Sequence, residues 1–244
     1  MQRELEVTVP FKGTIQTRDR LIFALDVSSS DEALHYIEQL GDAVNFYKLG
    51  LQIFMAGGYF ELVARLREKN KQVMVDLKLF DVPETVRLAV RALRTHEATF
   101  ATVHGNDAML QAAAEEKGNL GILAVTALTS LDQNDLEDLG FQCDVAKLVL
   151  SRAKRALSLG CDGVISSGLE APKLRECYGN AFVIITPGIR PVANVDDQKR
   201  TVDVEQAFRN GADYIVLGRP IRDAADPRRV AEAVQDRIAA LFKE

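Results

Sequence analysis

The sequence predicts an α/β protein with a single domain over residues 1–244, folded as a closed (β/α)8 TIM barrel. Short apolar runs rich in β-branched residues recur along the chain, and segments with helical periodicity separate them. Strands that alternate with helices pair in parallel through right-handed crossovers. The length of 244 residues suits a barrel, since α/β barrels use about 200 to 250 residues in one domain.

Eight runs predict the strands. They are 21–27 (LIFALDV), 46–51 (FYKLGL), 73–79 (VMVDLKL), 98–104 (ATFATVH), 121–128 (GILAVTAL), 163–167 (GVISS), 182–189 (FVIITPGI) and 214–218 (YIVLG). Apolar residues occupy both faces of these runs, as expected for strands that are buried on both sides. Periodicity alone leaves an open doubly wound sheet as an alternative. No GxGxxG follows the first strand, which weakens a dinucleotide-binding interpretation.

Helical periodicity is clearest in three segments between or after the strands. Residues 53–69 carry a broad apolar face, residues 144–159 place Lys and Arg opposite an apolar face, and residues 228–242 close the chain. Residues 1–19 precede the first strand, and we expect this extension to cover the N-terminal end of the barrel. No linker or low-complexity stretch divides the chain, which indicates one domain.

Composition and charge exclude several classes of protein. The net charge of −5 argues against a nucleic-acid partner, because such proteins are usually basic. No apolar run approaches the roughly 18 residues of a membrane helix. The charged N-terminus lacks the apolar region of a secretory signal. The three cysteines form no CxxC pair, which indicates a reducing compartment. We therefore expect a cytoplasmic protein without a membrane partner.

Polar residues gather where the predicted strands end, and barrel enzymes place their active sites at that end. The candidates are Asp26, Lys48, Asp76, Lys78, Asp81, Thr85, Thr129, Arg190, Gly218 and Arg219. His104 also ends a strand but is left out, because the next loop supplies no obvious second metal ligand. For Asp26 the alternative is a helix cap or a solvated loop residue. Three dispersed histidines are weak support for a metal site, so we expect no metal.

Asp76 and Lys78 of the third strand lie two residues apart, so both are expected on the same side of the sheet. Charges inside a barrel need partners, because an unpaired buried charge is costly. Lys48 on the adjoining strand and Asp81 beyond the strand end are the candidate partners. A lysine held between carboxylates stays protonated, which suits a proton donor. The alternative is an ion pair that only stabilises the fold.

A second signal indicates anion binding after the seventh and eighth strands, where barrels often bind phosphate. Gly218 lets an oxyanion approach the backbone, and Arg219 can hold it with two hydrogen bonds. Arg190 and Gln198 add donors from the preceding loop. A solvated surface run is the better interpretation for the adjacent residues 199–200.

The ordered motifs resemble one known family. Residues 76–85 read DxKxxDxPxT, and the other motifs are ALDV at 24–27, YKLG at 47–50, LTS at 128–130, TPGIRP at 186–191, DQKR at 197–200 and GADYIVLGRPI at 211–221. This set is similar to the orotidine 5′-monophosphate decarboxylase family of the bacterial type. The resemblance extends from Asp26 to Ile221, and the ordered set is far more specific than DxKxxD alone.

The resemblance implies a carboxy-lyase that converts orotidine 5′-monophosphate to uridine 5′-monophosphate, the last step of pyrimidine nucleotide synthesis, without metal or organic cofactor. It implies that Lys78 protonates C6 of the pyrimidine and that Asp76 lies near the substrate carboxylate. It also implies a homodimer, in which Asp81 from the neighbouring subunit completes the network of charges. The other implied contacts are Asp26, Lys48 and Thr85 for the ribose, Thr129 for the pyrimidine, and Arg190, Gln198, Gly218 and Arg219 for the phosphate.

Two segments depart from the family pattern. His104 is followed by Gly-Asn-Asp where many members have a Gly-Gly pair, and the loop 190–198 is slightly shorter and less rich in glycine. One alternative function is a magnesium-dependent sugar-phosphate decarboxylase or aldolase of the same superfamily, such as a hexulose phosphate synthase. Pro83, Thr85, the LTS motif and the DQKR motif argue against it. The other alternative is a barrel that only binds a nucleotide, which would not need Asp76 to oppose an anionic substrate.

Overall fold

Eight parallel strands form a closed barrel in the computed structural model, which describes residues 15–189 and 201–242. Each strand pairs with the next in the chain, and β8 pairs with β1. Closure confirms the predicted barrel and excludes the open sheet. The strands are β1 (Leu21–Ala24), β2 (Phe46–Gly50), β3 (Gln72–Leu79), β4 (Phe100–Val103), β5 (Gly121–Val125), β6 (Gly163–Ile165), β7 (Val183–Thr186) and β8 (Tyr214–Leu217).

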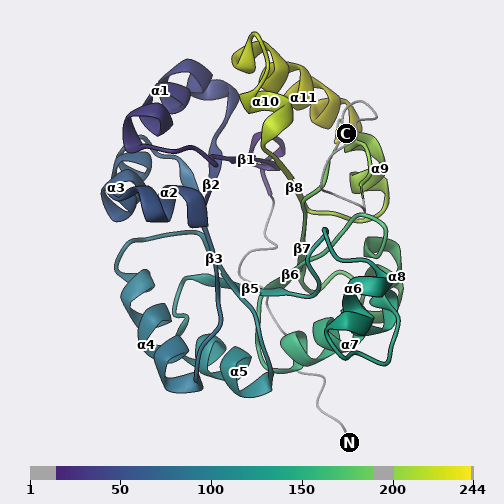
Figure 1. The fold of residues 1–244 in the computed structure, drawn as a ribbon. Coiled ribbons are helices and arrows are strands. Elements are labelled where there is room, and N and C mark those ends of the chain that lie inside the picture. Colours follow the sequence, from purple (N-terminus) through teal and green to yellow (C-terminus); the bar gives the residue numbers. More distant parts are fainter. Residues whose placement is uncertain (1–14, 190–200, 243–244) are drawn as a thin grey trace, which may run out of the picture.

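Helices surround this ring of strands (Figure 1). They are α1 (Ser30–Leu40), α2 (Leu51–Ala56), α3 (Tyr59–Glu68), α4 (Pro83–Arg94), α5 (Asp107–Glu116), α6 (Gln133–Asp138), α7 (Val145–Ser158), α8 (Ala171–Tyr178), α9 (Val204–Arg209), α10 (Arg219–Arg222) and α11 (Pro227–Leu241). Two 3-10 turns, η1 (Thr17–Asp19) and η2 (Gly41–Ala43), lie near β1 and β2 in the chain. The predicted segments 144–159 and 228–242 correspond to α7 and α11.

The predicted helical segment 53–69 is two helices in the structure. Gly57 and Gly58 separate α2 from α3, with φ angles of 86° and 68°. A helix cannot continue through this left-handed backbone, which glycine adopts at little cost. Phe54 of α2 is 38% exposed although its spacing predicts burial, and Ile53 is the residue of α2 that packs in the core.

Two apolar clusters fill the molecule. The larger lies between the strands and the helices, and the smaller fills the barrel interior. In the interior, the rings of Phe46 and Phe100 stack with centroids 5.8 Å apart, and Tyr214 meets both edge-on. Side chains alternate along a strand. The polar residues two positions after these apolar ones therefore also face the barrel interior, nearer the C-terminal ends of the strands. The apolar layer is thus the floor beneath the predicted site.

The N-terminal extension is only partly described. Ile15 packs against the interior cluster, while residues 1–14 lie outside the described residues. At the same end of the barrel the guanidinium of Arg20 lies 3.9 Å from the ring centre of Phe242 in the last turn of the chain. A cover over this end formed by residues 1–19 stays a prediction.

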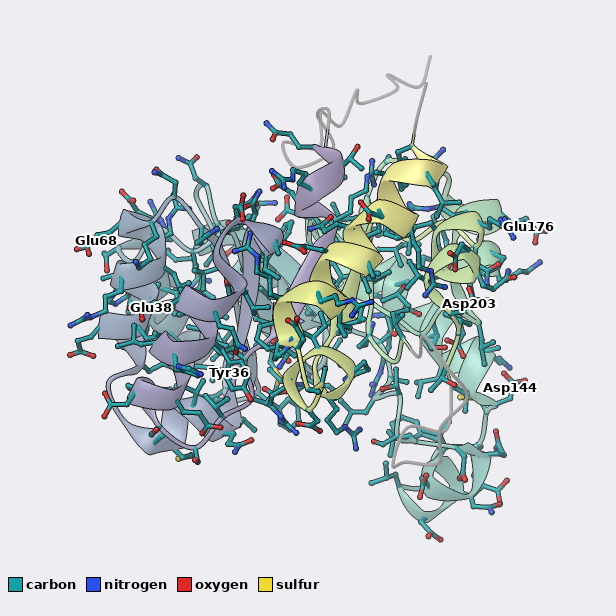
Figure 2. The ribbon with its side chains drawn as sticks, turned by 90° about the horizontal axis from the view of Figure 1, so that it is seen from above. Tyr36, Glu38, Glu68, Asp144, Glu176 and Asp203 are labelled. Atoms are coloured by element: carbon teal, nitrogen blue, oxygen red, sulfur yellow. The ribbon has the colours of Figure 1, made fainter. Side chains whose placement is uncertain are left out.

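The outer faces of several helices carry exposed charged side chains. Figure 2 shows the barrel from the side, with Glu38, Glu68 and Glu176 at its periphery, and all three are exposed. Tyr36 of α1 instead donates a hydrogen bond from its hydroxyl to the carbonyl of Arg222, which joins α1 to α10. Within residues 15–189 and 201–242, no helix has the length and apolar character that a membrane span requires.

Candidate active site

The C-terminal ends of the strands enclose a cavity of about 400 Å³. Its floor is apolar and includes Met74, Val125, Ile165 and Val216. Polar side chains occupy the wall above this floor, and Gly218 lies among them. The polar side chains are those of Asp26, Lys48, Asp76, Lys78, Thr129, Arg219 and Arg222. Seven residues of the predicted site therefore come together, although they belong to five different parts of the chain.

Four charged side chains form an alternating chain from β1 to β3. Lys48 Nζ lies 3.0 Å from Asp26 Oδ1 and 3.5 Å from Asp76 Oδ2. Lys78 Nζ lies 3.0 Å from Asp76 Oδ1. The side chains of Lys48 and Asp76 are only 12% and 11% exposed, whereas that of Lys78 is 34% exposed. Each carboxylate thus lies beside an ammonium group. The two ends of the chain, Asp26 and Lys78, are the more exposed side chains, at 38% and 34%.

Burial and the neighbouring charges shift the pKa values of Asp76 and Lys48 in opposite directions. Burial favours the neutral form of Asp76, but the ammonium groups of Lys48 and Lys78, with hydrogen bonds from Lys78 and Thr102, hold its pKa below the usual value. Burial likewise opposes the charge of Lys48, and Asp76 and Asp26 together raise its pKa above the usual value. Both groups are therefore ionised at neutral pH.

Small residues make room for the first pair of charges. A Cβ atom on Gly50 would lie 3.1 Å from both Asp26 Oδ1 and Lys48 Nζ, so a larger residue would press on the ion pair. The alternative interpretation of Asp26 as a helix cap is wrong. Ser29 caps α1 by accepting a hydrogen bond from the Glu32 N–H, and the Asp26 side chain turns to Lys48 instead.

The third strand is irregular where its charged residues lie. Its pairing with β4 shifts between Val75 and Leu79, and Lys78 has a φ angle of 48°. Asp76 and Lys78 meet as their spacing predicts, but a bulge brings them together rather than regular alternation. The hydroxyl of Thr102 on β4 bonds to both residues. Sequence analysis missed Thr102, although its place two residues after Phe100 was a signal that it faces the interior.

Arg222 is the second residue that sequence analysis missed. Its Nη1 donates a 2.8 Å hydrogen bond to the carbonyl of Asp26, and its side chain lines the cavity. This contact ties α10 to the end of β1 and supports the loop that carries Asp26. The only available signal was its position three residues after Arg219, one helical turn along.

Asp81 and Thr85 lie outside the cavity, in contrast to the seven predicted residues that line it. Both are exposed at the start of α4, and Asp81 Oδ1 accepts a 2.7 Å hydrogen bond from the Val82 N–H. Phe80 and Val82 beside them are 65% and 62% exposed. A single chain therefore does not bring Asp81 to Lys78.

The predicted phosphate residues are partly described. Gly218 and Arg219 lie at the cavity wall, and a Cβ atom on Gly218 would lie 3.2 Å from Ala24 Cβ. Arg190 and Gln198 lie outside the described residues. Across the barrel, Thr129 is half-buried and faces the same cavity. The part of the chain that the structure describes shows no group of three side chains suited to hold a metal ion.

His104 lies beyond the end of β4, outside the cavity wall. Its ring meets Phe80 edge-on, with centroids 5.4 Å apart. Burial, with added repulsion from Arg152 and Lys78, lowers the pKa of the imidazole below the usual value. The histidine is therefore neutral near pH 7, and it packs against the loop that follows β3.

The fold and the site define a (β/α)8-barrel enzyme whose charged groups are paired lysines and aspartates at the C-terminal end of the strands. Residues 19–234 match the model of the orotidine 5′-phosphate decarboxylase / HUMPS family. The chain belongs to this family.

Similar proteins cover nearly the whole chain. A protein of Methylococcus capsulatus named orotidine 5′-phosphate decarboxylase is 63% identical over 230 residues, which are 93% of this chain and 95% of the relative. A protein of the same name from Xanthomonas euvesicatoria is 48% identical over 94% of this chain and 96% of its own length. The crystal structure of orotidine 5′-phosphate decarboxylase from Lactobacillus acidophilus matches with a TM-score of 0.81 and 33% identity, covering 90% of this chain and 99% of that one. The resemblance inferred from the motifs is thereby confirmed.

Replacing Lys48 by methionine tests the electrostatic balance around Asp76. The substitution leaves a buried carboxylate with one ammonium partner fewer, and we expect the free energy of unfolding at pH 7 to fall by about 3 kcal/mol. The pKa of Asp76 lies below its usual value in the native protein. The ionised carboxylate therefore adds to the free energy of unfolding at every pH above the usual pKa of an aspartate. This contribution is lost as the pH falls through the lower pKa of the native protein.

In Lys48→Met the carboxyl should bind a proton at higher pH, because burial then dominates. The difference in stability between the two proteins should therefore narrow as the pH is lowered from 7 to about 4. Urea unfolding at several pH values measures this difference. Lys147→Met, at an exposed position on α7, is the control for loss of a lysine. A difference that is the same at every pH would contradict this account of Asp76.

Proposed function

We propose that this chain decarboxylates orotidine 5′-monophosphate to uridine 5′-monophosphate in pyrimidine nucleotide synthesis, and that Lys78 delivers a proton to C6 without metal or organic cofactor. The observation that carries the proposal is the ammonium of Lys78 held 3.0 Å from the buried Asp76 beside the cavity. The names of the relatives at 63% and 48% identity support the same reaction.

The chemistry requires a positive charge in a fixed place. Loss of carbon dioxide from C6 leaves a carbanion in the plane of the ring, where no π system delocalises it. An ammonium group about 4 Å away offsets this charge by about 4 kcal/mol at an effective dielectric constant near 20. Lys78 then transfers its proton to C6, which converts the carbanion to a C–H bond.

Asp76 and Lys48 prepare this step. Asp76 orients the ammonium of Lys78 and lies where the substrate carboxylate leaves, so its charge opposes the bound carboxylate and favours its loss. Lys48 keeps Asp76 ionised from the other side, at 3.5 Å. The buried middle of the charge chain, Lys48 and Asp76, thus holds Lys78 at its end in the reactive state.

The cavity offers a place for each part of the nucleotide. Asp26 and Lys48 would bind the ribose hydroxyls, and Thr129 across the barrel would contact the pyrimidine. Gly218 and Arg219 would hold the phosphate, together with Arg190 and Gln198. Support comes from the cavity itself, which Asp26, Lys48, Thr129, Gly218 and Arg219 all line.

A homodimer would complete the site with Asp81 from the second subunit, and Thr85 one turn along α4 would accompany it. The support is the exposed position of Asp81 and the apolar surface around it. This surface covers α2, the β3–α4 junction and α4, which follow the neighbouring strands β2 and β3. Its large exposed side chains are Leu51, Phe54, Met55, Phe80, Val82 and Leu88. An apolar patch of this kind marks an association surface.

A cytoplasmic location is part of the same proposal. Cys143, Cys161 and Cys177 are the three cysteines of the sequence, and all three are free thiols in the structure. Free thiols are typical of a reducing compartment, where nucleotide synthesis takes place.

The loss of absorbance of orotidine monophosphate tests the reaction directly. Wild type should be active with and without EDTA, whereas Lys78→Ala should fold normally and lose at least about 10⁴-fold in kcat, because it removes both the fixed charge and the proton donor. Lys173→Ala, on the outer surface of α8, is the matched control. Activity abolished by EDTA would favour the magnesium-dependent alternative, and a Lys78→Ala kcat within tenfold of wild type would exclude the proton-donor role.

Subunit mixing tests whether the site is shared. Lys78→Ala and Asp81→Ala should each be inactive alone, but a heterodimer would contain one site with both defects and one intact site. Equal mixing gives about half heterodimers and hence about a quarter of wild-type activity, if the sites act independently. Native mass spectrometry confirms that the subunits have exchanged. No recovery after confirmed exchange would show that Asp81 does not act across an interface.

Truncated substrates test the assignment of the phosphate site. Arg219→Ala should lower kcat/KM for orotidine monophosphate, with a loss of transition-state stabilisation of about 3 kcal/mol, because the change removes a hydrogen bond between charged groups. The same change should have little effect on orotidine, which lacks the phosphate, and added phosphite should activate wild type more than the variant. Arg209→Ala, at an exposed position on α9, serves as control. An equal loss on both substrates would move the phosphate site elsewhere.

A further inference from the structure

Thr102 is a buried residue of β4 whose hydroxyl uses both of its hydrogen-bonding functions on the charged residues of β3. It is 0% exposed. Its Oγ1 accepts a 2.9 Å hydrogen bond from the backbone N–H of Lys78 and donates a 2.9 Å hydrogen bond to Asp76 Oδ1. One side chain therefore links the backbone of the proton donor to the carboxylate that orients its ammonium.

The bulge in β3 explains why this link matters. Val75 pairs with Ala101 and Leu79 pairs with Val103, so residues 76–78 lie opposite Thr102 alone. Within this bulge, the backbone N–H of Lys78 donates a 2.9 Å hydrogen bond to the Thr102 hydroxyl. The hydroxyl substitutes for the strand pairing that the bulge interrupts.

Lys78 also adopts a backbone conformation that disfavours a residue with a side chain. Its φ of 48° lies in the left-handed region, which costs a non-glycine residue on the order of 1 kcal/mol and persists only where its surroundings hold it. Asn70 and Glu97, the other described non-glycine residues with positive φ, lie next to helix ends. At Lys78 the hydrogen bond to Thr102 anchors the strained residue directly.

We propose that Thr102 is a positioning residue for the decarboxylation, which holds the β3 bulge so that the Lys78 ammonium and the Asp76 carboxylate face the reacting carbon together. This role rests on the proposed function. Asp76 Oδ1 accepts hydrogen bonds from the Thr102 hydroxyl and the Lys78 ammonium, while Oδ2 lies beside the Lys48 ammonium. Both oxygens are thereby fixed in direction.

Loss of the hydroxyl would act through these two neighbours. The Lys78 N–H would be left without its acceptor, and Asp76 Oδ1 would lose one donor, so the bulge would relax and the ammonium would shift. A displacement of about 1 Å at a reacting group can cost about 100-fold in rate. Substrate binding through the ribose and phosphate sites would change little, because Thr102 contacts neither Asp26 nor Arg219 in the described structure.

The test compares variants of Thr102 that separate the hydroxyl from the size of the side chain. Thr102→Val has nearly the same shape without the hydroxyl, and we expect kcat for orotidine monophosphate to fall about 100-fold with KM within about threefold of wild type. Thr102→Ser retains the hydroxyl and should keep kcat within about threefold. Thr186→Val is the matched control, because Thr186 is a buried threonine of β7 whose hydroxyl has no hydrogen-bond partner among the described residues.

Each outcome decides the matter. An active wild type whose Thr102→Val variant keeps kcat within threefold would overturn the role of Thr102 alone, as would a loss confined to KM or an equal loss in Thr102→Ser. A wild type without decarboxylase activity would overturn the proposed function and this role with it. Circular dichroism melting checks the fold of each variant. Thr102→Ala, with the same expected loss of kcat, replaces the valine variant if that variant does not fold.

Discussion

The carboxylate of Asp76 between two ammonium groups is the interaction on which the rest of the site depends. A carboxylate this deeply buried would normally take up a proton. Lys48 and Lys78 on either side, with a hydrogen bond from Thr102, keep it ionised. Lys48 needs Asp26 in turn, because it is buried as well. The charges are therefore stable only as a set, and all four side chains line the cavity.

The barrel supplies the geometry that this set requires. Asp26 lies in the loop after β1, Lys48 lies on β2 and Asp76 lies on β3. Parallel pairing brings the ends of these three strands to the same level. The apolar interior layer beneath them excludes water from below, which strengthens each ionic contact. Gly50 leaves the space for one ion pair, and the bulge at Lys78 bends the other toward the cavity.

Under the proposed function, the position of Asp81 would connect the chemistry of the site to assembly. Lys78 has a carboxylate on its buried side, while Asp81 of the same chain is exposed at the start of α4 among apolar side chains. A second subunit that covers this surface would bury the apolar side chains and could bring its own aspartate to Lys78. The same contact would then stabilise the dimer and complete the network, so that assembly and activity would depend on each other.

The sequence by itself determined the barrel, the family and most of the polar side chains that line the cavity. Apolar runs that alternate with helical segments indicate strands that are buried on both faces. The DxKxxDxPxT pattern, Lys48 and Gly218-Arg219 lie at or near the ends of these strands. Only the tertiary structure decided which residues meet: Thr102 binds Asp76 and Lys78, Arg222 binds the Asp26 carbonyl, and Asp81 stays outside the cavity. Periodicity reports which face a residue occupies, whereas the bulge in β3 and the left-handed backbone of Lys78 depend on contacts with β4, which is distant in sequence.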